Sequence, residues 1–330
     1  MTTIYHEADA DPTALAGATV AVVGYGNQGR SWALNLRDSG CDVRVAVRAD
    51  ASRDQAVADG FVAGDLASAA EADVVCVLVP DDAIATLGLE PRPDALVVVA
   101  SGYCLAFDRW VPDCDVAMVA PRMLGPEVRS CYEEGVGFIT AVGVHRDRTG
   151  AALARTLAVA HAIGGLRQGA IEMTPTQEAV LDLAVEQALA PALRLVSTTF
   201  TEVMLAEGVP LEAILCELFL SGEVERTYRR LRTEGYAAQM AHHSPTSQYG
   251  QLSRADRYAG ADVATPMRAI VAEIRDGRFA DKWDAERATG YATLEALRAA
   301  ALPEAITAWE AELRATLGEG AAGSTPLTDP

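Results

Sequence analysis

The apolar positions of the chain change their pattern near residue 170. Before that point, short Val-rich runs bounded by Gly, Pro or Asp alternate with segments of helical periodicity. The runs are ATVAVVGYG (18–26), CDVRVAVR (41–48), ADVVCVLVP (72–80), DALVVVASG (94–102), DVAMVAP (115–121) and GFITAVGVH (137–145). Such runs are typical of buried parallel strands that alternate with helices in βαβ units. The pattern predicts an α/β domain with a parallel-rich sheet over residues 1–170.

Beyond residue 170 the strand signals disappear and helical periodicity continues to about residue 318. This half therefore reads as a second, all-α domain over residues 171–318. The last segment, GEGAAGSTPLTDP (318–330), is small, polar and contains proline. We expect residues 319–330 to form a disordered tail, because such a composition buries little apolar surface.

Composition and charge exclude several classes of function. A chain of 330 residues can form two domains with hydrophobic cores. Its net charge of −19 argues against a nucleic-acid surface and against binding to anionic membranes. The six cysteines are scattered and form no CxxC pair, so we read them as reduced core residues. With no apolar signal region at the N-terminus, we expect a soluble, cytoplasmic protein.

The first strand runs directly into GYGNQG, which is followed by the helical segment RSWALNLRDSG (30–40). Gly24, Gly26 and Gly29 have the spacing G-x-G-x-x-G, which permits a tight turn and close approach of the backbone to a pyrophosphate. The motif is weak alone, but its place between a Val-rich strand and a helix makes it a strong signal. It predicts a dinucleotide-binding Rossmann domain, with the intervening Tyr25, Asn27 and Gln28 also at the cofactor.

The end of the second strand indicates which dinucleotide binds. An NAD site usually has Asp or Glu there, whereas this chain has Arg48, followed by Ser52 and Arg53. Cations and a hydroxyl suit a 2′-phosphate, so the sequence favours NADPH. Asp50 lies in the same loop and would repel that phosphate. Asp81 and Asp82, which follow the third Val-rich run in VPDD, are predicted at the carboxyl edge of the sheet, beside the cofactor.

GYGNQGRSWALNLRDSGCDVRVAVR resembles the nucleotide-binding segment of the ketol-acid reductoisomerase family. The likeness continues through VPDD (79–82), APRMLGPEVRSCYEEGVG (120–137), IGGLRQGAIE (163–172), DLAVEQ (182–187), SPTSQYG (244–250) and DGRFADKW (276–283). It covers nearly the whole chain, in order, at the length of the family's short form. The resemblance implies a knotted helical domain and a homodimer whose active site is shared between chains. It also places Gly125, in the segment 120–137, at the cofactor.

In that family two helices carry acids that hold a pair of Mg²⁺ ions. Asp182 and Glu186 match the pair on the first helix, Glu217 matches the third acid, and Ser244 matches a serine that touches substrate. Four-residue spacing puts Asp182 and Glu186 on one helix face, where two carboxylates repel unless they face water or share a cation. Clustered carboxylates suit Mg²⁺, so the resemblance favours the shared cation over simple exposure to solvent.

The chain departs from the family pattern at positions around the chemistry. Ser221 stands where the family has a fourth glutamate, and Ser101 of ASGY stands where it has a histidine. Arg122 replaces a lysine, Pro126 occupies the place of a further histidine, and Val185 replaces a glycine. The dinucleotide loop is intact. The departures therefore concern the metal and substrate end of the site.

The family reaction combines an alkyl migration, which needs two metal ions, with hydride transfer to a 2-keto acid. Loss of the fourth carboxylate should weaken the second metal most, while Asp182, Glu186 and Glu217 could still hold one Mg²⁺ that polarises a carbonyl. Arginine stays protonated and offers a planar fork, so Arg122 suits a carboxylate clamp, and Ser101 would shape the pocket.

We therefore predict an NADPH-dependent reductase of the family. It would act on a C=O (or C=N) next to a carboxylate-like anchor, without alkyl migration, in a specialised pathway. The predicted catalytic set is Asp182, Glu186, Glu217, Arg122, Ser101, Ser221 and Ser244. Two alternatives remain open: a genuine ketol-acid reductoisomerase of branched-chain amino-acid synthesis, and a non-catalytic dinucleotide-binding homologue.

Overall fold

The computed structural model describes residues 1–301 and 304–317, and it divides into two compact units, Met1–Leu183 and Ala184–Pro330. The predicted tail at 319–330 lies outside the described residues. The change of sequence pattern predicted a boundary at residue 170, whereas the structure groups the next short strand and helix with the first unit. Each unit is described by itself.

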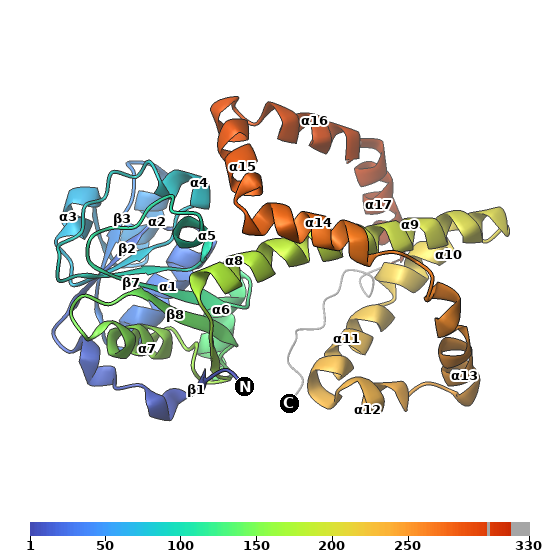
Figure 1. The fold of residues 1–330 in the computed structure, drawn as a ribbon, viewed down its shortest axis with the longest axis horizontal. Coiled ribbons are helices and arrows are strands. Elements are labelled where there is room, and N and C mark those ends of the chain that lie inside the picture. The colour runs from blue at the N-terminus through green and yellow to red at the C-terminus, as the bar shows by residue number, and fades with distance from the viewer. Residues whose placement is uncertain (302–303, 318–330) are drawn as a thin grey trace. The chain divides into compact units, whose positions relative to one another are not determined.

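The first unit is built on a nine-stranded sheet of order β1-β9-β8-β7-β6-β5-β2-β3-β4 (Figure 1). Strands β2 to β7 pair in parallel, β8 is antiparallel to β7, β9 is parallel to β8, and β1 is antiparallel to β9. The strands are β1 (Ile4–Tyr5), β2 (Thr19–Val23), β3 (Asp42–Ala46), β4 (Val62–Gly64), β5 (Val74–Val77), β6 (Leu96–Val99), β7 (Asp115–Pro121), β8 (Thr140–Arg146) and β9 (Ala170–Glu172). Each of the six predicted runs contains a strand. The short strands β1, β4 and β9 were not predicted, because two or three residues carry no periodic signal.

Helices cover both faces of this sheet. They are α1 (Asn27–Asp38), α2 (Ala51–Ala58), α3 (Leu66–Ala70), α4 (Asp81–Ile84), α5 (Tyr103–Ala106), α6 (Gly125–Glu133), α7 (Ala152–Ala162) and α8 (Pro175–Ala184), with the 3₁₀ turns η1 (Glu7–Asp9) and η2 (Pro12–Leu15). Successive side chains of β2 enter opposite cores: Val20 and Val22 pack with α1, α6 and α7, whereas Ala21 and Val23 pack with α3, α4 and α5. A strand buried on both faces reads as a continuous apolar run, which explains the sequence pattern.

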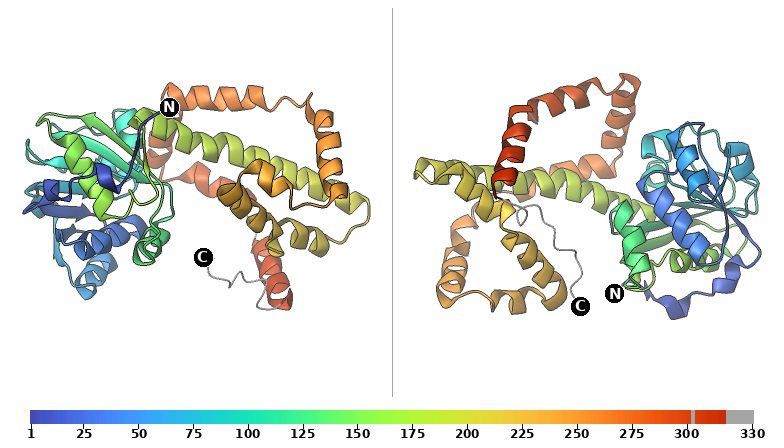
Figure 2. Two further views of the ribbon diagram at one scale, coloured as in Figure 1. Left: turned by 90° about the horizontal axis from the view of Figure 1, so that it is seen from below. Right: turned by 180° about the vertical axis from the view of Figure 1, so that it is seen from behind.

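The second unit consists of helices joined by short loops, with no strand among its described residues (Figure 2). Its α-helices are α9 (Ala190–Ala206), α10 (Leu211–Leu215), α11 (Glu223–Glu234), α12 (Tyr236–Met240), α13 (Pro245–Arg254), α14 (Ala264–Arg275), α15 (Arg278–Ala288), α16 (Ala292–Ala301) and α17 (Glu304–Leu317). Two π-helical segments, η3 (Val185–Leu189) and η4 (Cys216–Leu220), and the 3₁₀ turn η5 (Ala255–Tyr258) interrupt the α-helical geometry. None of the described helices is long and apolar enough to cross a membrane.

Candidate active site

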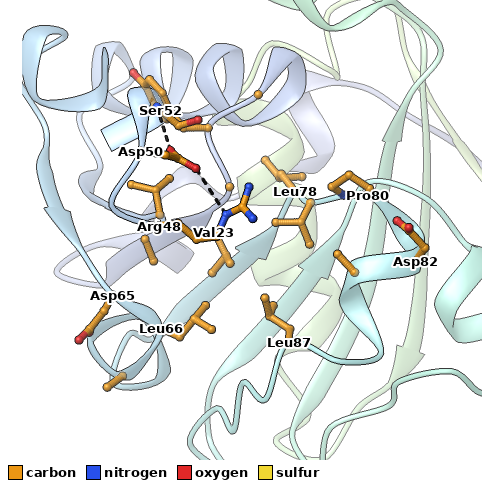
Figure 3. Close-up of a pocket in the computed structure, with 18 residues that line it drawn as sticks. Val23, Arg48, Asp50, Ser52, Asp65, Leu66, Leu78, Pro80, Asp82 and Leu87 are labelled. Atoms are coloured by element: carbon orange, nitrogen blue, oxygen red, sulfur yellow. Dashed lines mark hydrogen bonds and ion pairs between the residues drawn. The ribbon is translucent and has the colours of Figure 1, made fainter. Parts of the chain in front are cut away.

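A cavity of about 780 Å³ opens at the carboxyl ends of β2, β3 and β5 (Figure 3). Strand β2 pairs with β3 on one side and with β5 on the other, so the order of strands reverses here. Open α/β sheets bind their ligands at such a switch point. The cavity is lined by six of the residues predicted at the cofactor: Gly24, Tyr25, Gly26, Arg48, Ser52 and Asp82.

Each of the three glycines of the fingerprint suits its position for a different geometric reason. Gly24 has a φ of 95°, and a Cβ there would lie 2.6 Å from the carbonyl oxygen of Leu78. A Cβ on Gly29 would lie 2.2 Å from the carbonyl oxygen of Gly24, so that position lets α1 start close to the strand. Gly26 borders open space, which leaves its backbone accessible to a pyrophosphate. The turn is thus shaped for a dinucleotide.

Arg48 and Asp50 form an ion pair at the rim of the cavity, with Nε and Oδ2 3.4 Å apart (Figure 3). The other oxygen of Asp50 accepts the backbone N–H of Ser52 at 3.0 Å and caps α2. Arg53 does not line the cavity, because its guanidinium donates to the carbonyl of Ala63 on β4. Arg48 is therefore the arginine that faces this space.

Asn27, Gln28 and Gly125 lie where the start of α1 meets the start of α6. A Cβ on Gly125 would be 2.6 Å from the Cβ of Asn27, and the carbonyl of Gly125 accepts the Ser31 hydroxyl at 2.8 Å. Gln28 donates its amide to the carbonyl of Met123 at 3.3 Å. These contacts hold the helix start in place. A direct role of the three residues at the cofactor stays a prediction, as it does for Asp81.

Asp59 anchors the tyrosine of the fingerprint from the end of α2. It accepts the Tyr25 hydroxyl at 2.8 Å and the Arg30 guanidinium at 2.7 Å and 3.1 Å. The hydrogen bond from Arg30 is the main reason why the pKa of Asp59 falls to about 2, although partial burial opposes it. Burial and the same carboxylate raise the pKa of Tyr25, so the phenol stays protonated. The side chain that lines the cavity is thereby held in one position.

A buried carboxylate, Glu178, connects three parts of the first unit at the same edge of the sheet. One of its oxygens accepts the backbone N–H of Gly102 at 2.7 Å, and the other accepts both terminal nitrogens of Arg122 at 3.0 Å and 3.1 Å. Arg122 also donates to Asp182 at 2.7 Å. Burial raises the pKa of Glu178, and the Gly102 N–H and the Arg122 charge oppose that rise.

Sequence analysis did not select Glu178. A signal was present, because Glu178, Asp182 and Glu186 recur every four residues along one predicted helix face. Asp182, which was predicted to bind metal, forms an ion pair with Arg122, which was predicted to bind substrate. Both roles stay predictions.

The two serines at the altered family positions bond to nearby backbone. The Ser101 hydroxyl accepts the N–H of Tyr103 at 3.2 Å, and the Ser221 hydroxyl accepts the N–H of Glu223 at 3.3 Å. A Cβ on Gly102 would lie 2.1 Å from the carbonyl oxygen of Pro175, so the loop after β6 packs closely on the start of α8. The catalytic roles of both serines stay predictions.

Glu186 and Glu217 each lie in a π-helical segment, η3 and η4 respectively, and both are exposed. Single π-helical turns inside helices are rare and are frequent at functional sites. Across the described part of one chain, however, no three His, Cys, Asp or Glu side chains gather where they could hold a metal ion. The donor set is chemically suited to Mg²⁺. The metal site stays a prediction.

Ser244, the predicted substrate serine, caps the start of α13 by accepting the N–H of Ser247 at 3.2 Å. The preceding histidines belong to local networks in the same unit. His243 is 2.8 Å from the amide nitrogen of the buried Gln239, and His242 is 2.6 Å from a carboxylate oxygen of Glu234. The loop that presents Ser244 is therefore tied down on both sides of that residue.

Two family models together match most of the chain. Residues 14–169 match the family model described as "Acetohydroxy acid isomeroreductase, NADPH-binding domain", and residues 176–319 match "Ketol-acid reductoisomerase, C-terminal domain". The chain belongs to the ketol-acid reductoisomerase family. The predicted resemblance and the fold class, a Rossmann-type domain followed by a helical domain, are confirmed.

Relatives and solved structures of this family match most of the chain. A "Ketol-acid reductoisomerase (NADP(+))" of Caldivirga maquilingensis is 39% identical over 86% of this chain and 88% of its own length. One of the same description from Saccharopolyspora erythraea is 38% identical over 88% and 90%. The structure of an "NADH-preferring ketol-acid reductoisomerase" from an uncultured archaeon superposes with a TM-score of 0.86 at 29% identity, over 94% of this chain and 98% of that one. Ketol-acid reductoisomerases are oxidoreductases, and this member is an enzyme of that class.

Asp59→Asn should destabilise the first unit of this reductoisomerase homologue by about 1–2 kcal/mol at pH 7. The pKa of Asp59 is about 2 in the folded chain, below its ordinary value of 3.8, so its contribution is complete above about pH 4 and is lost as the pH falls towards 2. Urea unfolding of both proteins from pH 7 down to pH 2 should therefore show midpoints that converge. Asp54→Asn, at an exposed acid of the same helix, is the control. A gap that stays constant with pH would contradict the assignment.

Proposed function

We propose that this chain is an NADPH-dependent reductase of the ketol-acid reductoisomerase family that transfers a hydride to a C=O (or C=N) beside a carboxylate-like anchor, without alkyl migration. Family membership supports the coarser statement, an NAD(P)H-dependent reductase of this family. The finer statement is supported by one observation: the Arg122 guanidinium bonds to Asp182 and to Glu178. Hydride transfer without alkyl migration would suit an enzyme of a specialised pathway.

The charge at this edge of the sheet explains why migration is the step we consider lost. In the family pattern, migration depends on acids that hold two cations. Here Asp182 is already paired with the permanent positive charge of Arg122, and Ser221 provides a hydroxyl where a fourth carboxylate is expected. Both changes lower the negative charge that is available to a second divalent ion. Hydride transfer needs less, namely a bound dinucleotide and an oriented carbonyl.

NADPH supplies the hydride when it is bound. The chain's own groups bind and orient: the Gly24–Gly26 turn receives the pyrophosphate, and Tyr25 is fixed beside it by Asp59. Arg122 uses one N–H of Nη1 and both N–H groups of Nη2 for its acids, so its Nε–H and its second Nη1–H are the donors that we propose for a substrate oxygen. Glu178 accepts hydrogen bonds from the Gly102 loop and from Arg122 and so fixes the position of one relative to the other. Asp182, Glu186, Glu217 and Ser244 are proposed to complete the substrate site in the assembled protein.

A specific observation favours the second candidate, a genuine ketol-acid reductoisomerase. The relatives of Caldivirga maquilingensis and Saccharopolyspora erythraea bear that name at 39% and 38% identity over most of both chains. The reaction itself separates the candidates, because each of the two enzymes predicts a different product and the non-catalytic alternative predicts none.

NADPH oxidation at 340 nm with Mg²⁺ present should proceed with ketopantoate, a simple 2-keto acid, and should fail with 2-acetolactate. The physical reason is that reduction needs an oriented carbonyl, whereas rearrangement of acetolactate also needs the full set of cation ligands. Arg122→Ala should lower kcat/KM for the keto acid by about tenfold or more. Formation of the rearranged diol from acetolactate would instead establish a reductoisomerase, and no oxidation with either substrate would favour a non-catalytic homologue or another substrate.

The preference for NADPH is proposed from the rim of the cavity. Arg48 faces this space with its side chain 93% exposed, and Asp50 is occupied by Arg48 and by the cap of α2. The family model describes an NADPH-binding domain, and the archaeal structure is titled NADH-preferring, so the family's names include both cofactors. Arg48 is the residue on which we base the choice.

Arg48→Ala should raise the Kd for NADPH by about tenfold and leave the Kd for NADH nearly unchanged, because only NADPH carries the 2′-phosphate. Asp50→Asn keeps a cap for α2 and removes a negative charge, so it should tighten NADPH binding alone. Fluorescence titration of both cofactors measures this, with Arg53→Ala as the control that should change little. Equal losses for NADPH and NADH in Arg48→Ala would contradict the proposal.

We propose further that the chain forms a homodimer through its helical unit. Helix α9 has no buried residue along its length, and Leu195 and Val196 are 67% and 64% exposed. Phe200, Val203 and Leu205 of the same helix are also exposed, as is Phe219 of η4. A soluble chain rarely exposes so much contiguous apolar surface unless a partner covers it. A second copy would supply that cover and the acids that one chain does not bring together.

Sedimentation at micromolar concentration should show the wild-type chain as a dimer or a larger assembly. Leu195→Asp combined with Val196→Asp should give monomers with little activity, because charges on the apolar face of α9 would have to be desolvated in the interface. Val62→Asp, at an exposed apolar residue of edge strand β4, is the matched control. A wild-type monomer that turns over substrate would contradict both the dimer and the shared site.

A further inference from the structure

Arg122 bridges two carboxylates, one of which is the predicted metal ligand Asp182. Its guanidinium contacts Glu178, which is 2% exposed, at 3.0 Å, and Asp182, which is 47% exposed, at 2.7 Å. Arg122 itself is 28% exposed, so the pair with Asp182 is only partly screened by solvent. Arginine cannot lose its proton at any pH the protein meets. The charge is therefore permanent.

We propose that Arg122 is an internal cation that competes with divalent metal for Asp182 and so sets the metal affinity of this site. The inference rests on the proposed function and on the predicted role of Asp182 as a metal ligand. It goes further by naming the residue that limits metal binding in this chain. A metal that approaches Asp182 must either displace the guanidinium or bind beside it.

Both routes cost free energy. Displacement would leave the buried Glu178 with only the Gly102 N–H to stabilise its charge, and an unpaired buried carboxylate is strongly disfavoured. Binding beside Arg122 places a divalent ion next to a positive charge across a partly desolvated gap, where repulsion is much stronger than in water. Removal of the guanidinium charge should therefore strengthen metal binding even though it removes a favourable ion pair.

Glu178 favours Arg122 over a metal ion in the competition for Asp182. It binds both terminal nitrogens of Arg122 and, through its second oxygen, the loop at Gly102, where a close contact with Pro175 leaves no room for a Cβ. Arg122 is thus fixed from a buried partner, and only its contact with Asp182 faces the more exposed side. The geometry favours retention of Arg122 and weak metal binding at Asp182.

The test measures binding of Mn²⁺, as a spectroscopic substitute for Mg²⁺, to the full-length, metal-free protein by the loss of its free-ion paramagnetic resonance signal. Arg122→Gln removes the charge at similar length and should lower the Kd for Mn²⁺ at least about tenfold. Arg122→Lys keeps a charge without the planar fork and should give a smaller change in the same direction. As an orthogonal measurement, Mn²⁺ should raise the Tm of Arg122→Gln more than that of the wild type.

The matched control is Arg129→Gln. Arg129 also bridges two acids, Asp38 at 2.6 Å and Glu133 at 2.8 Å, with a half-buried side chain outside the site. Its substitution should leave Mn²⁺ affinity unchanged. Circular dichroism confirms that each variant is folded, and Arg122→Lys preserves the test if Arg122→Gln is not.

Three outcomes would overturn the inference. Equal Mn²⁺ affinity in the wild type and both Arg122 variants would show that Arg122 does not compete, and an equal gain in Arg129→Gln would show only a general effect of charge. Absence of Mn²⁺ binding in every protein would overturn both this inference and the placement of Asp182 as a metal ligand. The reductase proposal is judged separately by ketopantoate and acetolactate turnover, which the binding measurement does not involve.

Discussion

The buried carboxylate of Glu178 is the interaction on which the chemical end of the first unit depends. A charge in that position is tolerated only when it is paired and hydrogen-bonded. The chain meets this demand from two directions, with the backbone N–H of Gly102 after β6 and the guanidinium of Arg122 at the end of β7. Helix α8 is thereby joined to two neighbouring strand ends. Asp182, one turn along α8, takes its partner from the same arginine.

The dinucleotide end obeys a different constraint, which is steric. Gly24 and Gly29 lie where a Cβ would collide with backbone, so the turn between β2 and α1 can be close only with glycine at both places. Around this turn, Asp59 fixes the Tyr25 side chain, and Gly125 packs against the start of α1. Few charged groups face the rim of the cavity. Arg53 donates to the carbonyl of Ala63 on β4, and Asp50 accepts the Ser52 N–H that starts α2. The proposed preference for NADPH is therefore based on Arg48.

Two features of the described helical unit support the proposed homodimer. Helix α9 buries none of its side chains, and Glu186 and Glu217 are exposed on π-helical segments rather than gathered around a common point. The proposed second copy of the chain would account for both the apolar surface and the separated acids. Family membership is consistent with this, while the internal Arg122–Asp182 pair shows that an acid of the expected metal set has another partner within its own chain.

The sequence by itself determined the fold class and the fingerprint turn, since these depend on local periodicity and on the spacing of glycines. It also indicated the family, through the resemblance of motifs that recur in order along nearly the whole chain. Each of the six Val-rich runs contains a strand, because a strand buried on both faces is apolar at every position. It missed β1, β4 and β9, where pairing with a neighbour rather than periodicity defines the strand. It also missed Glu178, although that residue shares the four-residue spacing of Asp182 and Glu186. Only the tertiary structure decided that Arg122, sixty residues earlier in the chain, lies against Asp182, because the ends of β7 and α8 meet through folding and no local pattern records that contact.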